Sequence, residues 1–171
     1  GCPFGCPSGR YGDQEGGKNI SACGGKCPGG KFGNATGKDS ENFACPYLCV
    51  SGRFGNVTGQ TNQLGACIAS CSPGKYGIGP GKKEETKACT KCPAGLYGEQ
   101  AAGKSKSICI KCPFGRYGNT LGQSSKETAC NGTCLPGKYG TVKGATNSTS
   151  CQNCSSGRYA GDLPYSITLS S

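Results

Sequence analysis

The apolar positions of this chain recur in one short pattern, without a long helical or strand period. A cysteine is followed by glycine three residues later and by Tyr or Phe five residues later, and this pattern occurs eight times. The aromatic residues are 20 to 22 positions apart, at Tyr11, Phe32, Phe54, Tyr76, Tyr97, Tyr117, Tyr139 and Tyr159. A fixed period in this range is typical of a stacked array in which each unit mainly contacts its neighbours. The pattern therefore predicts a rod-like array of repeats.

Each unit carries the residues of a small hairpin. Pro or Ser with Gly after the second cysteine favours a turn, because Pro presets φ and Gly accepts a positive φ. The next two residues, one basic and one aromatic in most units, suit a short strand with one side chain out and one in. Glycines follow in the loop, and Gly103 is displaced by one position, which predicts an extra residue in the fifth loop.

The pattern thus predicts a small, disulfide-rich all-β fold. We expect an elongated array of about eight hairpin repeats of about 21 residues, with almost no helix. The array covers residues 1–162 and is followed by a strand-like tail, 163–171. Its units start near Cys2, Cys23, Cys45, Cys67, Cys89, Cys109, Cys130 and Cys151.

Composition shows what must hold such an array together. Leu, Ile, Val and Phe make up only 21 of 171 residues, about 12%, below the level of roughly 20% at which chains build an apolar core. The 16 cysteines form eight close pairs and supply another source of stability. Such a density of cysteine predicts a disulfide scaffold in an oxidising compartment.

The spacing favours one disulfide connectivity among the very many that 16 cysteines allow. Bonding the second cysteine of each unit to the first of the next closes loops worth roughly 3 kcal/mol each, whereas a bridge within a close pair restrains far less chain. The favoured pairs are Cys6–Cys23, Cys27–Cys45, Cys49–Cys67, Cys71–Cys89, Cys92–Cys109, Cys112–Cys130 and Cys134–Cys151. Cys2 and Cys154 are left to bond outside this set: to further repeats, to each other or between subunits.

Six of the nine asparagines lie in Asn-x-Ser/Thr, far more than chance would place there. These sequons predict N-linked glycans and passage through the secretory pathway to the cell surface or beyond. They are Asn19, Asn34, Asn56, Asn131, Asn147 and Asn153, the last weakened by the cysteine at its middle position.

Two other features bear on assembly. Seven of the eight residues before the aromatics are basic, with Leu96 the exception, and they form either a solvated face over the aromatic row or a contact for acidic glycans or a neighbouring filament. In the tail, Tyr165, Ile167 and Leu169 alternate with Ser and Thr, as in a half-buried strand. This strand either folds back, leads into a further domain, or adds to the next subunit's sheet.

Candidate chemistry is sparse. The chain has no His, and its nine carboxylates are scattered over loops, so we expect no enzyme activity. Zinc binding and redox catalysis would use C-x2-C pairs, but most pairs here have three intervening residues and all look equivalent, so we expect no cofactor or metal. Despite a net charge of +10, sequons and disulfides argue against nucleic acid as a partner.

The repeated CPxGxYG motif with its C-x2-3-C pairs resembles the ephrin-receptor-like cysteine-rich repeat, and more loosely the first half of tumour-necrosis-factor-receptor modules. The resemblance covers residues 1 to about 162; this chain lacks the six-cysteine block of a receptor module, and its tail leaves the pattern. It implies the same disulfide connectivity, and surface or fibre glycoproteins of protists and algae. We expect an extracellular structural protein that associates with itself and with other fibre proteins in a fibre, flagellar hair or coat.

The alternative is the ligand-binding or adhesive stalk of a receptor. In that case one or two units should diverge to form a binding patch. No stretch of about 18 apolar residues could span a bilayer, so any membrane attachment lies outside this segment. The chain begins within the pattern and contains no Met, which indicates a processed or partial segment.

Overall fold

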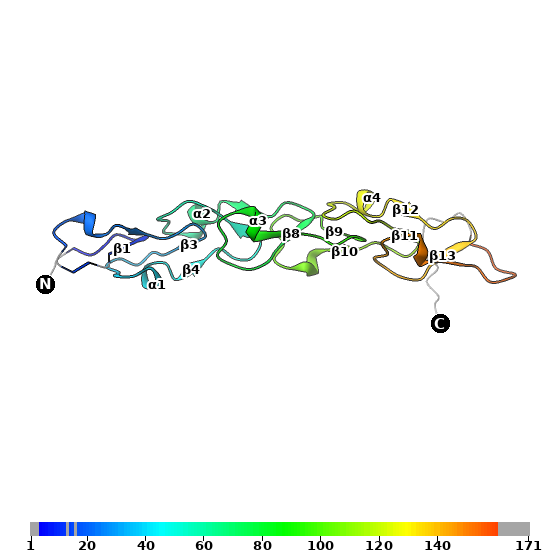
Figure 1. The fold of residues 1–171 in the computed structure, drawn as a ribbon, viewed down its shortest axis with the longest axis horizontal. Coiled ribbons are helices and arrows are strands. Elements are labelled where there is room, and N and C mark those ends of the chain that lie inside the picture. Colours follow the sequence, from blue (N-terminus) through cyan, green and yellow to red (C-terminus); the bar gives the residue numbers. More distant parts are fainter. Residues whose placement is uncertain (1–3, 13, 16, 161–171) are drawn as a thin grey trace. The chain divides into compact units, whose positions relative to one another are not determined.

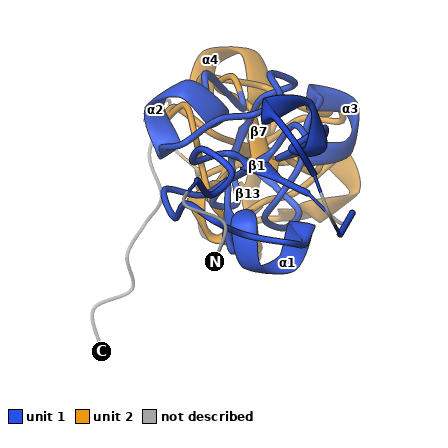
Figure 2. Cartoon of the chain, turned by 90° about the vertical axis from the view of Figure 1, so that its left-hand side faces the viewer, with its two compact units in different colours: residues 1–71, 77–89 blue, residues 72–76, 90–171 orange. Residues whose placement is uncertain are grey.

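The computed structural model describes residues 4–12, 14–15 and 17–160. The chain forms two compact units, residues 1–71 with 77–89 and residues 72–76 with 90–171 (Figure 2). Both units are built from the same short hairpin, repeated along the chain (Figure 1). We number the repeats one to eight by their aromatic residues, from Tyr11 to Tyr159.

Short strands pair within repeats one to seven. The described residues contain seven two-stranded sheets. The pairs are β1 (Arg10–Tyr11) with β2 (Gly25–Lys26), β3 (Lys31–Phe32) with β4 (Tyr47–Leu48), β5 (Arg53–Phe54) with β6 (Ala69–Ser70), β7 (Lys75–Gly77) with β8 (Cys89–Lys91), β9 (Leu96–Tyr97) with β10 (Ile110–Lys111), β11 (Arg116–Tyr117) with β12 (Gly132–Thr133), and β13 (Lys138–Gly140) with β14 (Cys151–Asn153).

One rule gives the register of these hairpins. The first strand carries the residue before the aromatic and the aromatic itself, and the second lies between the next two cysteines. In the sixth repeat Tyr117 lies opposite Gly132, and Arg116 lies opposite Thr133. A disulfide then closes each loop, at Cys6–Cys23, Cys27–Cys45, Cys49–Cys67, Cys71–Cys89, Cys92–Cys109, Cys112–Cys130 and Cys134–Cys151. This is the connectivity that the loop lengths favour.

A single helical turn precedes the cysteine that ends each bonded loop, although the sequence predicts almost no helix. Single turns carry no hydrophobic period, so the sequence gives no sign of them. Their type follows loop length: 13 residues from aromatic to cysteine give an α-turn, and 12 give a 3-10 turn. The α-turns are α1 (Glu41–Ala44), α2 (Gln63–Ala66), α3 (Glu85–Ala88) and α4 (Lys126–Ala129); the 3-10 turns are η1 (Ile20–Ala22), η2 (Lys106–Ile108) and η3 (Ser148–Ser150). In unit 1, α1, α2 and α3 lie on different sides of the strands, so successive repeats are rotated (Figure 2).

Neighbouring repeats within a unit are joined by two backbone hydrogen bonds. The Gly98 N–H, just after the aromatic of repeat five, donates to the Gln123 carbonyl of repeat six at 3.0 Å. In return, the Gly122 N–H donates to the Cys92 carbonyl at 2.8 Å. We call glycines at this donating position, five residues after the aromatic, tip glycines. In unit 1 the same two bonds run from Gly33 to Gln60 and from Gly59 to Cys27.

The tip position requires a left-handed backbone. Tip glycines Gly37, Gly59, Gly81, Gly122 and Gly144 have φ between +66° and +75°. In repeat five this conformation falls on Ala102, with φ +58°, five residues after Tyr97. The prediction of an extra residue in this loop is therefore wrong: the displaced Gly103 leaves an alanine at the tip, with no insertion.

A second glycine position sets how closely the repeats approach. The glycine of C-x2-G, here called the turn glycine, packs against the tip two repeats further on. A Cβ on Gly95 would lie 2.3 Å from the Gly144 carbonyl oxygen, and one on Gly30 would lie 2.7 Å from that of Gly81. Both glycines also have positive φ. Here glycine is needed for close backbone contact as well as for the turn.

The interior is made of cystine and alanine more than of aromatic rings. Cys27, Cys49, Cys92 and Cys112 are fully buried, as is the alanine before the first cysteine in the four repeats with α-turns, at Ala44, Ala66, Ala88 and Ala129. Three of the aromatics pack on the disulfide of the next repeat: Tyr11 on Cys27 and Cys45, Phe32 on Cys49 and Cys67, and Tyr97 on Cys112 and Cys130.

Turn glycines provide a matched test of the contact between repeats. Gly95 (φ +75°) faces the backbone of repeat seven, whereas Gly137 (φ +78°) has no atom within 4 Å of the position a Cβ would occupy. We expect Gly137→Ala to lower the free energy of unfolding by about 1 kcal/mol through φ strain alone, and Gly95→Ala by about 3 kcal/mol. Guanidinium unfolding with the disulfides intact measures both. Equal losses would show that the close approach has no energetic weight.

The aromatic positions provide a second test. Tyr97 is 8% exposed against the next disulfide, whereas Tyr159 is 85% exposed. Replacing Tyr97 by Ala should cost about 3 kcal/mol, and replacing Tyr159 should cost less than about 0.5 kcal/mol in the isolated chain. Guanidinium unfolding measures both losses of stability. Similar losses for the two variants would contradict packing of Tyr97 on the disulfide of the following repeat.

Candidate functional site

The packing face of the repeats is open at the C-terminal side of the described part of unit 2. Exposure of the aromatic rises from 8% at Tyr97 to 45% at Tyr139 and 85% at Tyr159. The turn glycines change in parallel, since Gly95 is buried and Gly137 is exposed. Leu135, within the turn of repeat seven, is 69% exposed. A surface that is buried in the inner repeats is therefore accessible here.

The eighth repeat holds half of a hairpin. The Cys154 N–H donates to the Gly137 carbonyl at 2.9 Å, just as the Cys112 N–H donates to Gly95 at 2.8 Å. Its turn is also formed, with the Arg158 N–H bonded to the Ser155 carbonyl. Yet Cys154 is a free cysteine, and 158–159, the equivalent of a first strand, are not in a strand.

Other predicted assembly residues fall outside the described part of the chain. Tyr165, Ile167 and Leu169 of the tail lie there, as does Cys2. The prediction that the tail adds to a neighbouring sheet stays a prediction.

The basic residues before the aromatics turn back on their own repeat at three positions. The Arg10 and Arg116 Nη1 atoms donate to the carbonyls of Cys23 and Cys130, at 3.4 and 3.1 Å. Those cysteines cap the C-terminal ends of η1 and α4, where cationic side chains are favourable. Lys31 instead pairs with Glu41 at 2.7 Å. At these three positions the basic residues therefore stabilise their own repeat.

The first turn of α4 carries a perturbed carboxyl. Bonds from its own backbone N–H and from the Ser125 hydroxyl hold the pKa of the exposed Glu127 below its usual range. Ser125 is the N-cap of this turn. The shift thus belongs to helix capping, and no second carboxylate is associated with it.

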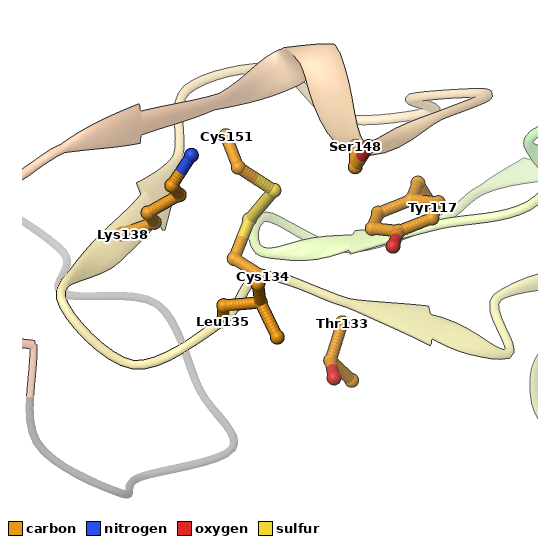
Figure 3. Close-up of a pocket in the computed structure, with 7 residues that line it drawn as sticks. All are labelled: Tyr117, Thr133, Cys134, Leu135, Lys138, Ser148 and Cys151. Carbon is orange, nitrogen blue, oxygen red and sulfur yellow. A yellow bond between two sulfur atoms is a disulfide. The ribbon is translucent and has the colours of Figure 1, made fainter.

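A hollow in unit 2 shows what a pocket of this fold offers (Figure 3). The Cys134–Cys151 disulfide lies at its centre, between Tyr117 and Lys138 (Figure 3). Its lining residues are Tyr117, Thr133, Cys134, Leu135, Lys138, Ser148 and Cys151. None of them is a carboxylate, so the hollow lacks an acid–base pair.

All six sequon asparagines are exposed, but two of them also cap helices. The Oδ1 atoms of Asn19 and Asn147 accept the backbone N–H of Ser21 and Thr149, both at 3.0 Å, at the starts of η1 and η3. The hydroxyls of Ser21 and Thr149 bond to the same oxygens. Each cap uses Oδ1 and leaves Nδ2, the glycan-bearing atom, outside these bonds. At these two positions the Asn and the Ser or Thr two residues later also form a helix cap, so capping alone would account for the motif.

Comparisons give no established relative: no protein-family model matches the chain, and no curated protein is significantly similar to it. The resemblance to ephrin-receptor-like repeats rests on the motif alone. Within the part of the chain that the structure describes, no helix is long and apolar enough to cross a bilayer. Nor does that part bring three His, Cys, Asp or Glu residues together as metal ligands.

Substitutions at Asn147 separate capping from glycosylation. Asn147→Asp keeps an N-cap acceptor and removes the sequon, whereas Asn147→Gln removes both. In chain secreted by a eukaryotic host, we expect both variants to lose the mass of one glycan, and only Asn147→Gln to lose about 1 kcal/mol of stability once all glycans are removed. Intact mass and guanidinium unfolding measure these effects. An unchanged mass in both would show that Asn147 carries no glycan.

Proposed function

We propose that this chain is a structural extracellular glycoprotein that builds a fibre, a surface appendage such as an algal flagellar hair, or a coat. The observation that carries this proposal is the equivalence of the repeats. Seven loops are closed by the same cysteine positions, with Cα–Cα distances of 5.4 to 5.8 Å. A fibre needs such uniformity, whereas a specific binding site needs at least one repeat to differ.

The proposed mechanism is mechanical. Each disulfide closes a loop with a sequence separation of 17 or 18, which contributes about 3 kcal/mol in the chain-entropy model. Backbone hydrogen bonds then join one repeat to the next, and glycans at the exposed sequons protect the surface. The seven disulfides indicate an oxidising, extracellular environment. The proposed partners are further copies of this chain and other fibre proteins.

The alternative class, the stalk of a receptor or adhesin, requires a repeat with its own binding surface. The hollow beside Tyr117 is the nearest feature to one. However, Cys134 and Cys151 in its lining stand at positions that are cysteine in every bonded repeat, and the position of Lys138 is basic in all of them but the fifth. This hollow therefore gives weak support to a receptor.

Electron microscopy tests the proposal directly. The glycosylated 171-residue chain, secreted and kept oxidised, should form filaments or sheets on concentration, and a thiol reductant should disperse them. The matched control is the same chain with its thiols reduced and alkylated before concentration. Dispersed single particles under every oxidising condition would contradict a fibre or coat.

A further inference from the structure

A second hollow lies in unit 1, where repeats two, three and four come together. Its volume is about 430 Å³, within the range of about 300–1,000 Å³ that small-molecule sites occupy. Two of its lining residues, Asn56 and Thr58, are the first and third residues of one sequon. The asparagine that would carry a glycan therefore stands in the wall of the hollow. We call it the Asn56 hollow, and it is lined by Pro28, Gly29, Asn56, Thr58, Lys83 and Glu84.

Close backbone contacts among the three repeats hold Asn56 in this place. A Cβ on Gly29 would lie 2.8 Å from the Asn56 Cα atom, so the turn of repeat two lies directly against the sequon. The Gly55 N–H, one residue before Asn56, donates to the Lys82 carbonyl of repeat four at 3.3 Å. A Cβ on Gly30 would lie 2.7 Å from the same Lys82 carbonyl oxygen. The carrier asparagine is thus fixed beside the residues of repeats two and four that line the hollow with it.

The lining offers both kinds of contact that a sugar makes. Pro28 and the backbone of Gly29, which has no side chain, present an apolar wall to the C–H face of a sugar ring. Lys83 supplies an ammonium donor and Glu84 a carboxylate acceptor for hydroxyl and acetamido groups. Among the described residues Lys83 makes no hydrogen bond or ion pair. Glu84 pairs with Lys87 through Oε1 at 3.4 Å, and its second carboxylate oxygen lies outside that contact.

We propose that the Asn56 hollow binds the first sugars of the chain's own Asn56-linked glycan. In an N-linked glycan these sugars are N-acetylglucosamine, which packs on Pro28 and Gly29 and hydrogen-bonds to Lys83 and Glu84. Because the covalent tether keeps the sugars at a high effective concentration beside the hollow, weak contacts suffice. The glycan thereby joins repeats two, three and four. The inference rests on the proposed function, since it gives the glycans of the proposed glycoprotein a role in stiffening the array.

Asn34 is a matched control within the same unit. It stands two residues after the aromatic of repeat two, as Asn56 does in repeat three, and both asparagines are exposed. The two charged positions of the hollow are uncharged there, at Thr61 and Asn62. The turn beside Asn34 also carries a side chain, Ser8, whose hydroxyl donates to the Asn34 carbonyl at 2.8 Å. We therefore expect a glycan on Asn34 to extend into solvent.

Enzymatic release of the glycans tests the contact inside one molecule. The chain is secreted by a eukaryotic host, kept oxidised, and treated with an amidase that removes N-linked glycans and converts each carrier asparagine to aspartate. Peptide mapping should show release at Asn56 several-fold slower than at Asn34 in the folded chain, and equal rates after reduction and denaturation. Equal rates in the folded chain, or an Asn56 that carries no glycan, would overturn the inference.

Lys83→Met separates sugar contacts from simple crowding of the enzyme. The variant keeps the length of the side chain and removes the ammonium donor, so release at Asn56 should become several-fold faster while release at Asn34 is unchanged. Lys18→Met is the control, because Lys18 is exposed and lies outside the hollow. If Lys83→Met and Lys18→Met release the Asn56 glycan at the same rate, the assigned contact with Lys83 is wrong.

Stability gives a readout that does not depend on enzyme access. Thr58→Ala and Thr36→Ala each remove one sequon and keep its asparagine. In the glycosylated chain, Thr58→Ala should lower the guanidinium midpoint by roughly a few tenths molar more than Thr36→Ala does. The same variants refolded from a bacterial host, which carry no glycan, correct for the side chains themselves. A corrected difference of zero would count against binding of the glycan in the hollow.

The outcomes also separate this inference from the proposed function. Filaments of a chain whose Asn56 and Asn34 glycans are released equally fast would leave the structural function standing and reject the glycan site. A protected Asn56 glycan on a chain that never gives filaments or sheets would establish the site and contradict the fibre or coat.

Discussion

The fold depends on the packing of one aromatic ring on the disulfide of the following repeat. Each bonded repeat supplies one ring at the repeated aromatic position, one cystine and, where the turn is α-helical, one buried alanine, and these cannot enclose a core by themselves. Stability therefore arises between repeats as much as within them. The gradient from Tyr97 through Tyr139 to Tyr159 shows the consequence inside one molecule, because a ring loses its cover where the next repeat is incomplete. The inner rings are therefore covered, and the ring of repeat eight is exposed.

Glycine sets the distance at which the ring can reach its disulfide. The turn glycine lies against the tip backbone two repeats away, so its missing Cβ determines the spacing of the stack. The tip residue must in addition have a positive φ to send its N–H back to the previous cysteine. Ala102 shows that the φ requirement alone can be met by another small residue, at an energetic cost. The close approach at Gly95 leaves no such freedom. The many glycines of this chain resemble a low-complexity composition. In this fold, however, the turn and tip glycines each make a specific backbone contact.

Much of this architecture could be predicted from spacing. The hairpin repeats follow from the period, and the seven disulfide loops follow from the positions of the cysteines. The helical turns could not be predicted, because three or four residues have no periodicity; only loop lengths of 12 and 13 residues mark them in retrospect. The contact between Gly95 and Gly144 could not be predicted from the sequence either, because it joins repeats that are not adjacent. Finally, Asn19 and Asn147 each lie in a glycosylation sequon and also cap a helical turn. The sequence alone could not separate capping from glycosylation.

The groups that stabilise an inner repeat are exposed at repeat eight, where Tyr159 is 85% exposed. An ordinary globular domain buries its apolar groups and needs a second, separate surface to bind a partner. Here Tyr159 and Cys154 occupy the positions of the packing groups of an inner repeat, so a repeat that covered them would use the contacts by which the inner repeats fold.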